Sequence, residues 1–351
     1  MSISSKLRAL AGHAIRMLKQ QLRILWYFLT FDLSELKLLR EYDDDRMRFS
    51  SCAYFDHQTD HETESTLSRM TQLAHGIEKG LSFREPKRPF FLSKIDKLID
   101  ATTQYLGKAD ASTTDKRLEM VSTSLASFLE FHLDEKGGSL LPDNVQQKIS
   151  ELLERINKPK GESLLVLDSQ FGHSISKNEF EKFIKTRRSI RNFSNERVDN
   201  QAILKCVELA MHSPSVCNRQ SWRVKILDDK SMQEKALSFQ TGNVGFGHEA
   251  SHVLVVGCDL RDFYTIVERN QAFVDGGLFC MSLVYALHAH GIGSCCLNWC
   301  VASGRDRKFR QTLGLEEWFR TTMLIAVGKR NDDISVPYSI RRSVEDIAEI
   351  L

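Results

Sequence analysis

The hydrophobic pattern of the chain changes about halfway along its length, and this change limits the possible folds more than any other feature. Before residue 160, apolar residues recur at steps of three and four, which predicts helices and no convincing strand. From residue 178 onward, helical segments alternate with runs such as WRVKILDD and HVLVVGCDL, which are typical of strands. The sequence therefore predicts two parts: a mostly helical N-terminal extension, residues 1–170, and a sheet-containing domain, residues 171–351.

The individual elements follow from the same periodicities. Helices are expected in the extension over 67–81, 93–106, 116–133 and 145–156. In the second part, helices are expected on either side of an arginine cluster (178–193 and 199–213) and over 273–291, and strands over 222–229, 252–260 and 320–330. The second part is long enough to bury a substantial core of its own.

Composition describes an ordinary folded protein. The 351 residues are 42% hydrophobic and carry a formal charge of +2, so the chain lacks the basic excess that nucleic-acid binding usually requires. The eight cysteines form no CxxC pair, and we interpret them as reduced thiols of a cytosolic protein. Cys295, Cys296 and Cys300 have no histidine or carboxylate at ligand spacing. We interpret these three as small apolar residues lining a tight packed turn, with a redox or metal role as the alternative, and we predict no metal site.

The first 40 residues hold seven Lys or Arg against two acids, and apolar residues recur from Ile15 to Leu29 at helical steps. The longest uncharged run, Ile24 to Phe31, is far shorter than the roughly 20 residues that a membrane-spanning helix needs, and no signal-peptide cleavage site follows it. We interpret the segment as an amphipathic helix that packs on its own protein. The alternative is a helix that lies on an anionic membrane surface or contacts another protein.

The motif RRSIRNF, residues 187–193, concentrates three arginines on or just after a predicted helix end. A guanidinium group places two donors on a phosphate and a serine hydroxyl adds a third, so the motif suits a phosphorylated small molecule. A solvated helix terminus is the alternative. Further motifs follow it: SPSVCNRQSW at 213–222 offers uncharged donors and acceptors for a heteroaromatic ring, and two glycines precede Asn298 and Trp299.

These motifs, in this order and together with LIAVGKR, resemble the successive blocks of the flavin-dependent nitroreductase family over nearly all of residues 180–345. The resemblance implies an FMN-binding α+β fold with a central, mainly antiparallel sheet flanked by helices. It also implies a homodimer whose two active sites lie at the subunit interface. The stretch HGIEKGLS, residues 75–82, is similar to an extension of nitroreductase-like proteins encoded with polysaccharide-synthesis genes.

Carried over by position, the resemblance assigns cofactor-binding residues along the second part. Arg187, Arg188 and Ser189 match residues that hold the phosphate and ribityl chain of FMN. Arg191 matches a cation beside the N1 and O2 edge of the ring, where it stabilises the negative charge of the reduced flavin. Either Arg341 or Arg342 is expected to close the phosphate site.

The remaining assignments surround the flavin ring. Pro214, Ser215 and Asn218 match a segment that approaches the flavin from the partner subunit, and Asn243 matches a polar contact. The backbone of Leu297, Asn298 and Trp299 corresponds to the groups that face N5. Asn298 and Trp299, together with Arg191 beside the N1 and O2 edge, are therefore the catalytic candidates. Two departures from the family pattern, Ser221 in place of a proline and Phe246 near a position held by lysine in some members, leave the substrate range open.

The activity that the resemblance implies is hydride transfer from NADH or NADPH through FMN to an electron-poor small molecule such as a nitroaromatic compound or a quinone. One alternative is a flavin-dependent dehydrogenase or oxidase of a biosynthetic intermediate. Another is a flavin-holding dimeric adaptor in a polysaccharide-assembly system, docked through its helical extension. In each case a cytoplasmic protein is expected, with attachment to the inner face of the membrane as a variant.

Overall fold

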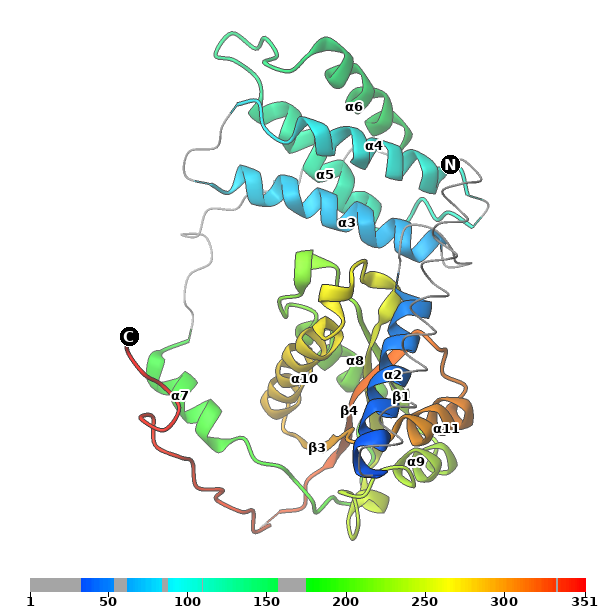
Figure 1. Ribbon diagram of the computed structural model, residues 1–351. Coiled ribbons are helices and arrows are strands. Elements are labelled where there is room, and N and C mark those ends of the chain that lie inside the picture. Colours follow the sequence, from blue (N-terminus) through cyan, green and yellow to red (C-terminus); the bar gives the residue numbers. More distant parts are fainter. Residues whose placement is uncertain (1–32, 54–61, 84–87, 109, 157–174, 333) are drawn as a thin grey trace.

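The structure is a computed structural model, and it describes residues 33–53, 62–83, 88–108, 110–156, 175–332 and 334–351 (Figure 1). The apolar stripe from Ile15 to Leu29 lies outside the described residues, as does the expected boundary between residues 170 and 171. The described chain forms a helical bundle and a sheet domain, which lie one above the other in Figure 1.

The bundle contains the helices that the periodicity predicts before residue 160. Its helices are α3 (Glu62–Leu81), α4 (Leu92–Leu106), α5 (Lys116–Phe131) and α6 (Asp143–Arg155). Each contributes apolar side chains to one shared core, in which Ile77, Leu98, Leu125 and Ile149 are fully buried. Because this core draws only on residues 67–156, the bundle has a hydrophobic interior separate from that of the sheet domain.

The sheet domain is built on four strands in the order β1-β2-β4-β3, all antiparallel to their neighbours. The strands are β1 (Trp222–Leu227), β2 (His252–Asp259), β3 (Ile292–Asn298) and β4 (Phe319–Lys329). This arrangement, with the helical region before it, confirms the expected α+β fold with a mainly antiparallel sheet. The segment around Cys295 and Cys296 is strand β3 rather than a tight turn, because it pairs with β4 along its whole length.

The sheet is the middle of three layers, as the alternation along β2 makes clear. Leu254 and Val256 face a core shared with α8 (Asn200–Ala210) and α10 (Gln271–Ala289), whereas Val253 and Val255 face a core shared with α9 (Lys230–Leu237) and α11 (Ser303–Leu313). Every residue of β2 is buried, because the strand is covered on both faces.

Helix α10 crosses the sheet closely. A Cβ at Gly276 would lie 2.5 Å from Thr322 Oγ1 on β4, so glycine is required for this approach. Within the described residues, the stretch Ile266–Ala289 is long and apolar enough to span a membrane, but 50% of it is buried inside the protein. Its hydrophobicity is therefore explained by its place against the sheet.

Helix α2 (Leu33–Cys52) belongs by sequence to the N-terminal extension, yet it packs on the sheet domain (Figure 1). Phe49, Cys52 and Ala53 enter the core shared by α8 and α10. Carboxylates of α2 also cap the first turn of α11: Glu41 accepts from the Ser303 amide, and a neighbouring aspartate accepts from the Ser303 hydroxyl, each at 2.6 Å.

Helix α7 (Lys177–Thr186) ends just before the arginine cluster, so the arginines do follow a helix end, whereas the helical range 178–193 extends seven residues too far. The chain leaves α7 in an extended conformation at Arg187 and runs beside the sheet, where the Ile190 amide donates to the Ser294 carbonyl at 2.9 Å. None of the residues of α7 is buried. The C-terminal tail after β4 returns toward α7, and the two lie apart from the main body of the domain in Figure 1.

Candidate functional site

An arginine pocket lies where the extended segment after α7 meets the C-terminal tail. Its volume is about 130 Å³, and its lining consists of Arg187, Arg188, Ser189 and Arg191 together with Pro337, Ser339 and Arg341. The segment is held in place by the bond from Ile190 to β3 and by the pairing of Phe193 with Arg330 after β4. The structure thus brings together the cationic residues that the motif predicts, although they come from both ends of the domain.

The arginine pocket is strongly positive. No carboxylate is among the described residues that line it. Arg188 donates to the carbonyls of Lys185 and Arg187, which fixes its direction without neutralising its charge. Uncompensated guanidinium groups repel one another, so the arrangement is stabilised when an anion with several acceptor oxygens binds between them.

A second cavity of about 180 Å³ lies on the other side of Arg187 and Arg188 and is lined also by His288, Ser294 and Arg330. The Thr186 hydroxyl lies 3.2 Å from His288 Nε2. Burial, followed by the charges of Arg187 and Arg330, lowers the pKa of His288 below its usual value. The imidazole is therefore neutral near pH 7, and the positive charge on this side of the cluster belongs to arginines.

The structure distinguishes the two arginines of the tail. Arg341 lines the arginine pocket and donates to the Ser339 carbonyl. Arg342 instead forms an ion pair with Asp346, at 3.7 Å, and donates to the carbonyl of the same residue. Arg341 is therefore the residue placed to contact an anion in the pocket.

Asn243 and the end of β3 form a second, separate part of the predicted site. The Asn243 amide donates to the carbonyls of Leu237 and Gln240, so it shapes the turn after α9. Gln240, which is 6% exposed, donates from Nε2 to the Asn298 carbonyl at 3.1 Å. Leu297 is buried, and Asn298 is exposed at the last position of β3. Gln240 thus fixes the backbone that the sequence predicts to face the flavin.

The segment with Pro214, Ser215 and Asn218 does not line the arginine pocket. Its 3-10 turn η2 (Val216–Asn218) packs against α3 of the bundle, and the Val216 amide donates to the Asp275 carboxylate. Cys217, Asn218 and Gln220 have φ values of 50°, 52° and 54°, which lie in the left-handed region. Such conformations cost about 1–3 kcal/mol each, so the surroundings of this segment hold it in shape.

Arg219 is the anchor of that segment. It is 4% exposed and donates to the Asp262 carbonyl and to the Glu268 carboxylate, both at 2.8 Å. Its guanidinium lies over the Tyr264 ring, 4.3 Å from the centroid. The side chain therefore fastens the left-handed residues on both sides of it to the loop after β2.

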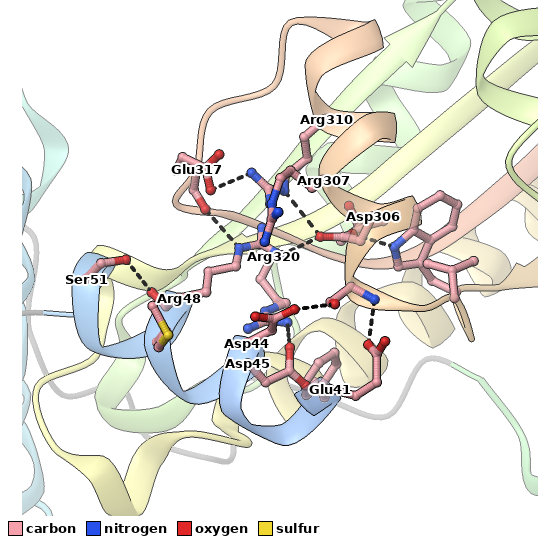
Figure 2. Close-up of a pocket in the computed structure, with 16 residues that line it drawn as sticks. Glu41, Asp44, Asp45, Arg48, Ser51, Asp306, Arg307, Arg310, Glu317 and Arg320 are labelled. Carbon is pink, nitrogen blue, oxygen red and sulfur yellow. Dashed lines mark hydrogen bonds and ion pairs between the residues drawn. The ribbon is translucent and has the colours of Figure 1, made fainter. Parts of the chain in front are cut away.

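Trp299 lines a third cavity, between α2 and α11, of about 330 Å³ (Figure 2). Its indole Nε1 donates to Asp306 Oδ1 at 2.8 Å, and its ring lies 4.2 Å from that of Phe309. Arg48, Arg310 and Arg320 enter the same cavity and pair with Asp306, Glu317 and Asp45, respectively. Most of the charge in this cavity is thus compensated, in contrast to the arginine pocket.

Sequence reasoning missed Gln240, Asp306 and Arg48. The one signal that could have pointed to Gln240 is its place three residues before Asn243. Asp306 and Arg48 gave no signal, because charged residues at helical spacing are usually solvated and nothing in the pattern pairs positions 258 residues apart. Gln240 and Asp306 bond to Asn298 and Trp299, respectively, and Arg48 bonds to Asp306.

Within the described residues, Glu64, Asp259 and Asp262 form the one group of carboxylates close enough together to hold a metal ion. A cation already lies among them. Arg223 Nη2 is 3.0 Å from Glu64 Oε1, 3.1 Å from Asp259 Oδ2 and 3.8 Å from Asp262 Oδ2. We therefore interpret the group as an ion-pair network and not as a metal site.

All eight cysteines are free thiols. Burial raises the pKa of Cys258 to about 12 and that of Cys206 to about 11, so these thiols stay protonated near neutral pH. They contribute packing and no nucleophile.

Comparison with known proteins identifies the domain. Residues 184–242 and 229–329 match the sequence model of the nitroreductase family. YdgI of Bacillus subtilis, named as an NAD(P)H nitroreductase, is 26% identical over 213 residues, which cover 50% of this chain and 99% of YdgI. A protein of Archaeoglobus fulgidus, named as an NADH dehydrogenase or NAD(P)H nitroreductase, is 28% identical over 155 residues, with 43% of this chain and 86% of that protein covered.

Among solved structures, a nitroreductase of Desulfovibrio desulfuricans in complex with FMN is 21% identical, covers 50% of this chain and 99% of its own, and superposes with a TM-score of 0.44. The stretch that the family model matches, residues 184–329, contains the four strands and the helices on both faces of the sheet. The chain thus contains, over residues 184–329, a domain that matches the nitroreductase family.

Proposed function

We propose that this protein is an FMN-dependent oxidoreductase that passes hydride from NADH or NADPH to an electron-poor small molecule, such as a nitroaromatic compound or a quinone. The observation that carries the proposal is the arginine pocket, because a family domain that binds a phosphorylated cofactor needs an uncompensated positive site. The relatives from Bacillus subtilis and Archaeoglobus fulgidus, which are named as NAD(P)H nitroreductases, support the same class of electron donor.

The residues of the pocket fit the phosphate of FMN. Arg187, Arg188 and Arg341 offer charge-assisted donors, and the Ser189 hydroxyl adds a neutral one. We assign Arg191, farther along the extended segment, to the flavin ring, where its charge favours the reduced form. FMN, when bound, supplies the hydride-transfer chemistry at its N5 atom.

The chain's own contribution at the ring is positional. We assign the backbone of Leu297, Asn298 and Trp299 to the face of N5, with Gln240 holding the Asn298 carbonyl and Trp299 fixed by Asp306. Asn243 has its amide protons engaged in its own turn, which leaves its side-chain oxygen as the group available to the flavin. No acid, base or nucleophile of the protein is required for the transfer, since the cofactor carries it.

A homodimer completes the site in this proposal. Within one protomer, the described residues that line the arginine pocket do not include Pro214, Ser215 or Asn218, which supports a second copy as their source. One face of α10 is suited to that contact, because it carries the exposed apolar side chains of Phe273, Val274, Leu278 and Met281. The exposed apolar residues of the tail, such as Tyr338 and Ile340, extend the same kind of surface.

Two alternatives keep part of this proposal. In a dehydrogenase or oxidase of a biosynthetic intermediate, the same residues hold FMN but an organic substrate reduces it. In a flavin-holding adaptor, the bundle docks a partner in a polysaccharide-assembly system and turnover is incidental. The ion-paired contact between bundle and sheet domain favours an enzyme whose extension is part of one folded unit. We further propose a cytoplasmic protein, with residues 1–40 as the segment to test for attachment at the inner face of the membrane.

An absorbance spectrum and an anaerobic titration test the function. The purified protein is expected to be yellow, to lose its flavin absorbance on addition of NADH or NADPH, and to regain it with a quinone or a nitro compound. Absence of FMN binding after reconstitution would contradict the proposal. Rapid reduction by an organic substrate but not by either nicotinamide would support the dehydrogenase alternative.

A further inference from the structure

Asp306, which is labelled in Figure 2, joins helix α2 of the N-terminal extension to Trp299, the residue that follows β3. Its Oδ1 accepts from the Trp299 indole at 2.8 Å, and its Oδ2 accepts from Arg48 Nη1 at 2.6 Å. The two oxygens of one carboxylate therefore link parts of the chain that are more than 250 residues apart.

The link is largely shielded from water. The side chains of Arg48 and Asp306 are 9% and 12% exposed, so their interaction is screened much less than that of a surface pair. Burial, followed by the charge of Arg320, lowers the pKa of Arg48 to about 10, which still leaves the guanidinium protonated at neutral pH. Arg48 thus keeps its positive charge near pH 7.

Arg48 uses its other donors on the sheet domain. Nε donates to the Glu317 carbonyl at 3.0 Å and Nη2 to the Phe319 carbonyl at 2.5 Å. Removal of α2 would leave both carbonyls and one carboxylate oxygen without this partner. Arg310 Nε, 3.2 Å from Asp306 Oδ2, would remain to hold the carboxylate, but from α11 alone. The direction of Asp306 therefore depends on whether α2 is docked.

Trp299 passes this dependence to the backbone. Its ring contacts both the Asp306 carboxylate and the Phe309 ring, and its amide follows Asn298, whose carbonyl is held by Gln240. The turn after β3 is thus fixed from two sides, by Gln240 and by Asp306. Movement of Asp306 changes one of these two restraints.

We propose that Asp306 is a positioning residue through which the docking of α2, by way of Arg48, sets Trp299 and the backbone of residues 297–299 against the flavin. This inference rests on the proposed function, because it requires FMN to lie against that backbone. It assigns the N-terminal extension a part in the active site: the residues matched by the family model begin at 184, and Arg48 lies outside them.

The same cavity offers a matched control. Asp45, also on α2, pairs with Arg320 on β4 at 2.6 Å, and within the described chain neither residue forms a hydrogen bond or ion pair with Trp299. The side chain of Asp45 is 55% exposed and that of Arg48 is 9% exposed, so Arg48→Met is expected to destabilise the protein more than Asp45→Asn even if α2 only fastens the two parts. The comparison therefore concerns the surroundings of Trp299 and not stability. If Arg48 acts through Asp306, only Arg48→Met should change the surroundings of the Trp299 indole.

The first measurement needs no cofactor. Fluorine NMR of protein labelled with fluorotryptophan, with the Trp299 resonance assigned by Trp299→Phe, reports the surroundings of the indole in flavin-free protein. The resonance is expected to shift in Arg48→Met and Asp306→Ala and to stay in place in Asp45→Asn. Arg48→Lys, which keeps the charge but not the forked donors, provides a milder variant should Arg48→Met fail to fold. An unchanged Trp299 resonance in folded Arg48 variants overturns the proposal.

The second measurement is FMN affinity in a double-mutant cycle. Arg48→Met is expected to raise the FMN dissociation constant about 5-fold in the parent and hardly at all when Trp299→Phe is already present, because both changes remove the same restraint. Asp45→Asn combined with Trp299→Phe should be additive. Additive effects of Arg48→Met and Trp299→Phe overturn the proposal even if the resonance moves. If the parent protein binds no FMN, the proposed function is contradicted instead. The NMR measurement, which uses flavin-free protein, still tests the link from Arg48 to Trp299.

Discussion

Glu64 on α3 and Arg223 on β1 form an ion pair, with 3.0 Å between Oε1 and Nη2, that connects the helical bundle to the sheet domain. Arg117 of α5 donates to both oxygens of Glu64, at 2.7 and 3.3 Å. Ser65 and Ser68, both 1% exposed, donate to the carbonyls of residues 261 and 262. The contact between the two parts is therefore polar and buried, which makes it sensitive to the loss of any one charge.

Glu64→Gln tests this contact. The change removes one negative charge from between two arginines, and the free energy of unfolding is expected to fall by about 1–3 kcal/mol, since a buried polar group loses its charged partner. Urea unfolding followed by circular dichroism measures it. Asp96→Asn, which breaks the exposed pair of Asp96 with Lys148, is the control and should have no measurable effect. Equal stability of the Glu64 variant and the parent would contradict the structural role of the network.

Asp262 gives the same contact a dependence on pH. Burial, and then the charge of Asp259, raise the pKa of this carboxyl to about 8. Between the ordinary aspartate pKa, about 4, and this raised value, the folded protein holds a proton that the unfolded chain has released, so stability falls as pH rises through that window. In Asp262→Asn this contribution disappears. Unfolding free energies measured from about pH 6 to about pH 8 should decline less steeply in the variant than in the parent. Parallel slopes would show that Asp262 is ionised in the folded state.

Arg341→Ala and Arg342→Ala separate the two arginines of the tail. Only Arg341 lines the arginine pocket, so its loss is expected to raise the FMN dissociation constant about 10-fold, the effect of one charge-assisted hydrogen bond. Arg342 pairs with Asp346 on the surface, and its loss should leave affinity unchanged. Fluorescence titration of flavin-free protein with FMN measures both, and the reverse order would place the wrong arginine at the phosphate.

Arg191→Ala should act on potential more than on affinity. A cation beside the ring stabilises the reduced flavin, and its removal is expected to lower the two-electron midpoint potential on the order of 30 mV, about 1.4 kcal/mol. Arg187→Ala is the comparison, because its position in the pocket predicts weaker FMN binding with little change in potential. Spectroelectrochemical titration distinguishes the two, and equal potentials in the Arg191 variant and the parent would contradict the division of roles.

Leu278→Glu tests the dimer. Leu278 is 44% exposed on the apolar face of α10, and a charge there would remain hydrated in a monomer but be desolvated in an interface. The variant is expected to sediment as a monomer and to lose FMN. In a monomer, the segment around Ser215 of a second copy is no longer there to complete the FMN site. Lys205→Glu, a charge change on the exposed surface of α8, serves as the control. A variant that is monomeric and still binds FMN tightly would show that one protomer suffices.

Periodicity predicted most of the architecture because it records which side chains are buried. The bundle helices, α10 and the strands β1, β2 and β4 all have patterns set by a core on one or both faces. The same reasoning predicted no helix over residues 33–52, where α2 lies, because charged residues such as the acidic run EYDDD interrupt its apolar pattern. It also predicted a helix over 187–193, whereas this segment is extended in the structure, because it forms a hydrogen bond to β3 and pairs with Arg330.

The candidate site was predictable to the extent that its residues are contiguous. Arg187, Arg188 and Ser189 are recognisable in the sequence as one motif, and the structure brings them together with Arg341. The choice between Arg341 and Arg342 depends on the path of an irregular tail, for which no periodicity exists. The linking role of Asp306 depends on two contacts of one carboxylate, with Trp299 seven residues away and with Arg48 258 residues away. Local sequence patterns do not predict either contact.

The left-handed residues at 217, 218 and 220 bear on how this protein tolerates change. Asparagine occupies that conformation more readily than other side chains, whereas cysteine and glutamine do so against their preference. Glycine at either of the latter positions would relax the backbone and, on folding free energy alone, would be favoured. Directed evolution toward heat resistance would therefore tend to enrich glycine at 217 and 220, and a lineage that keeps both residues under such selection would reveal that their side chains, and not only the shape of the backbone, have a role.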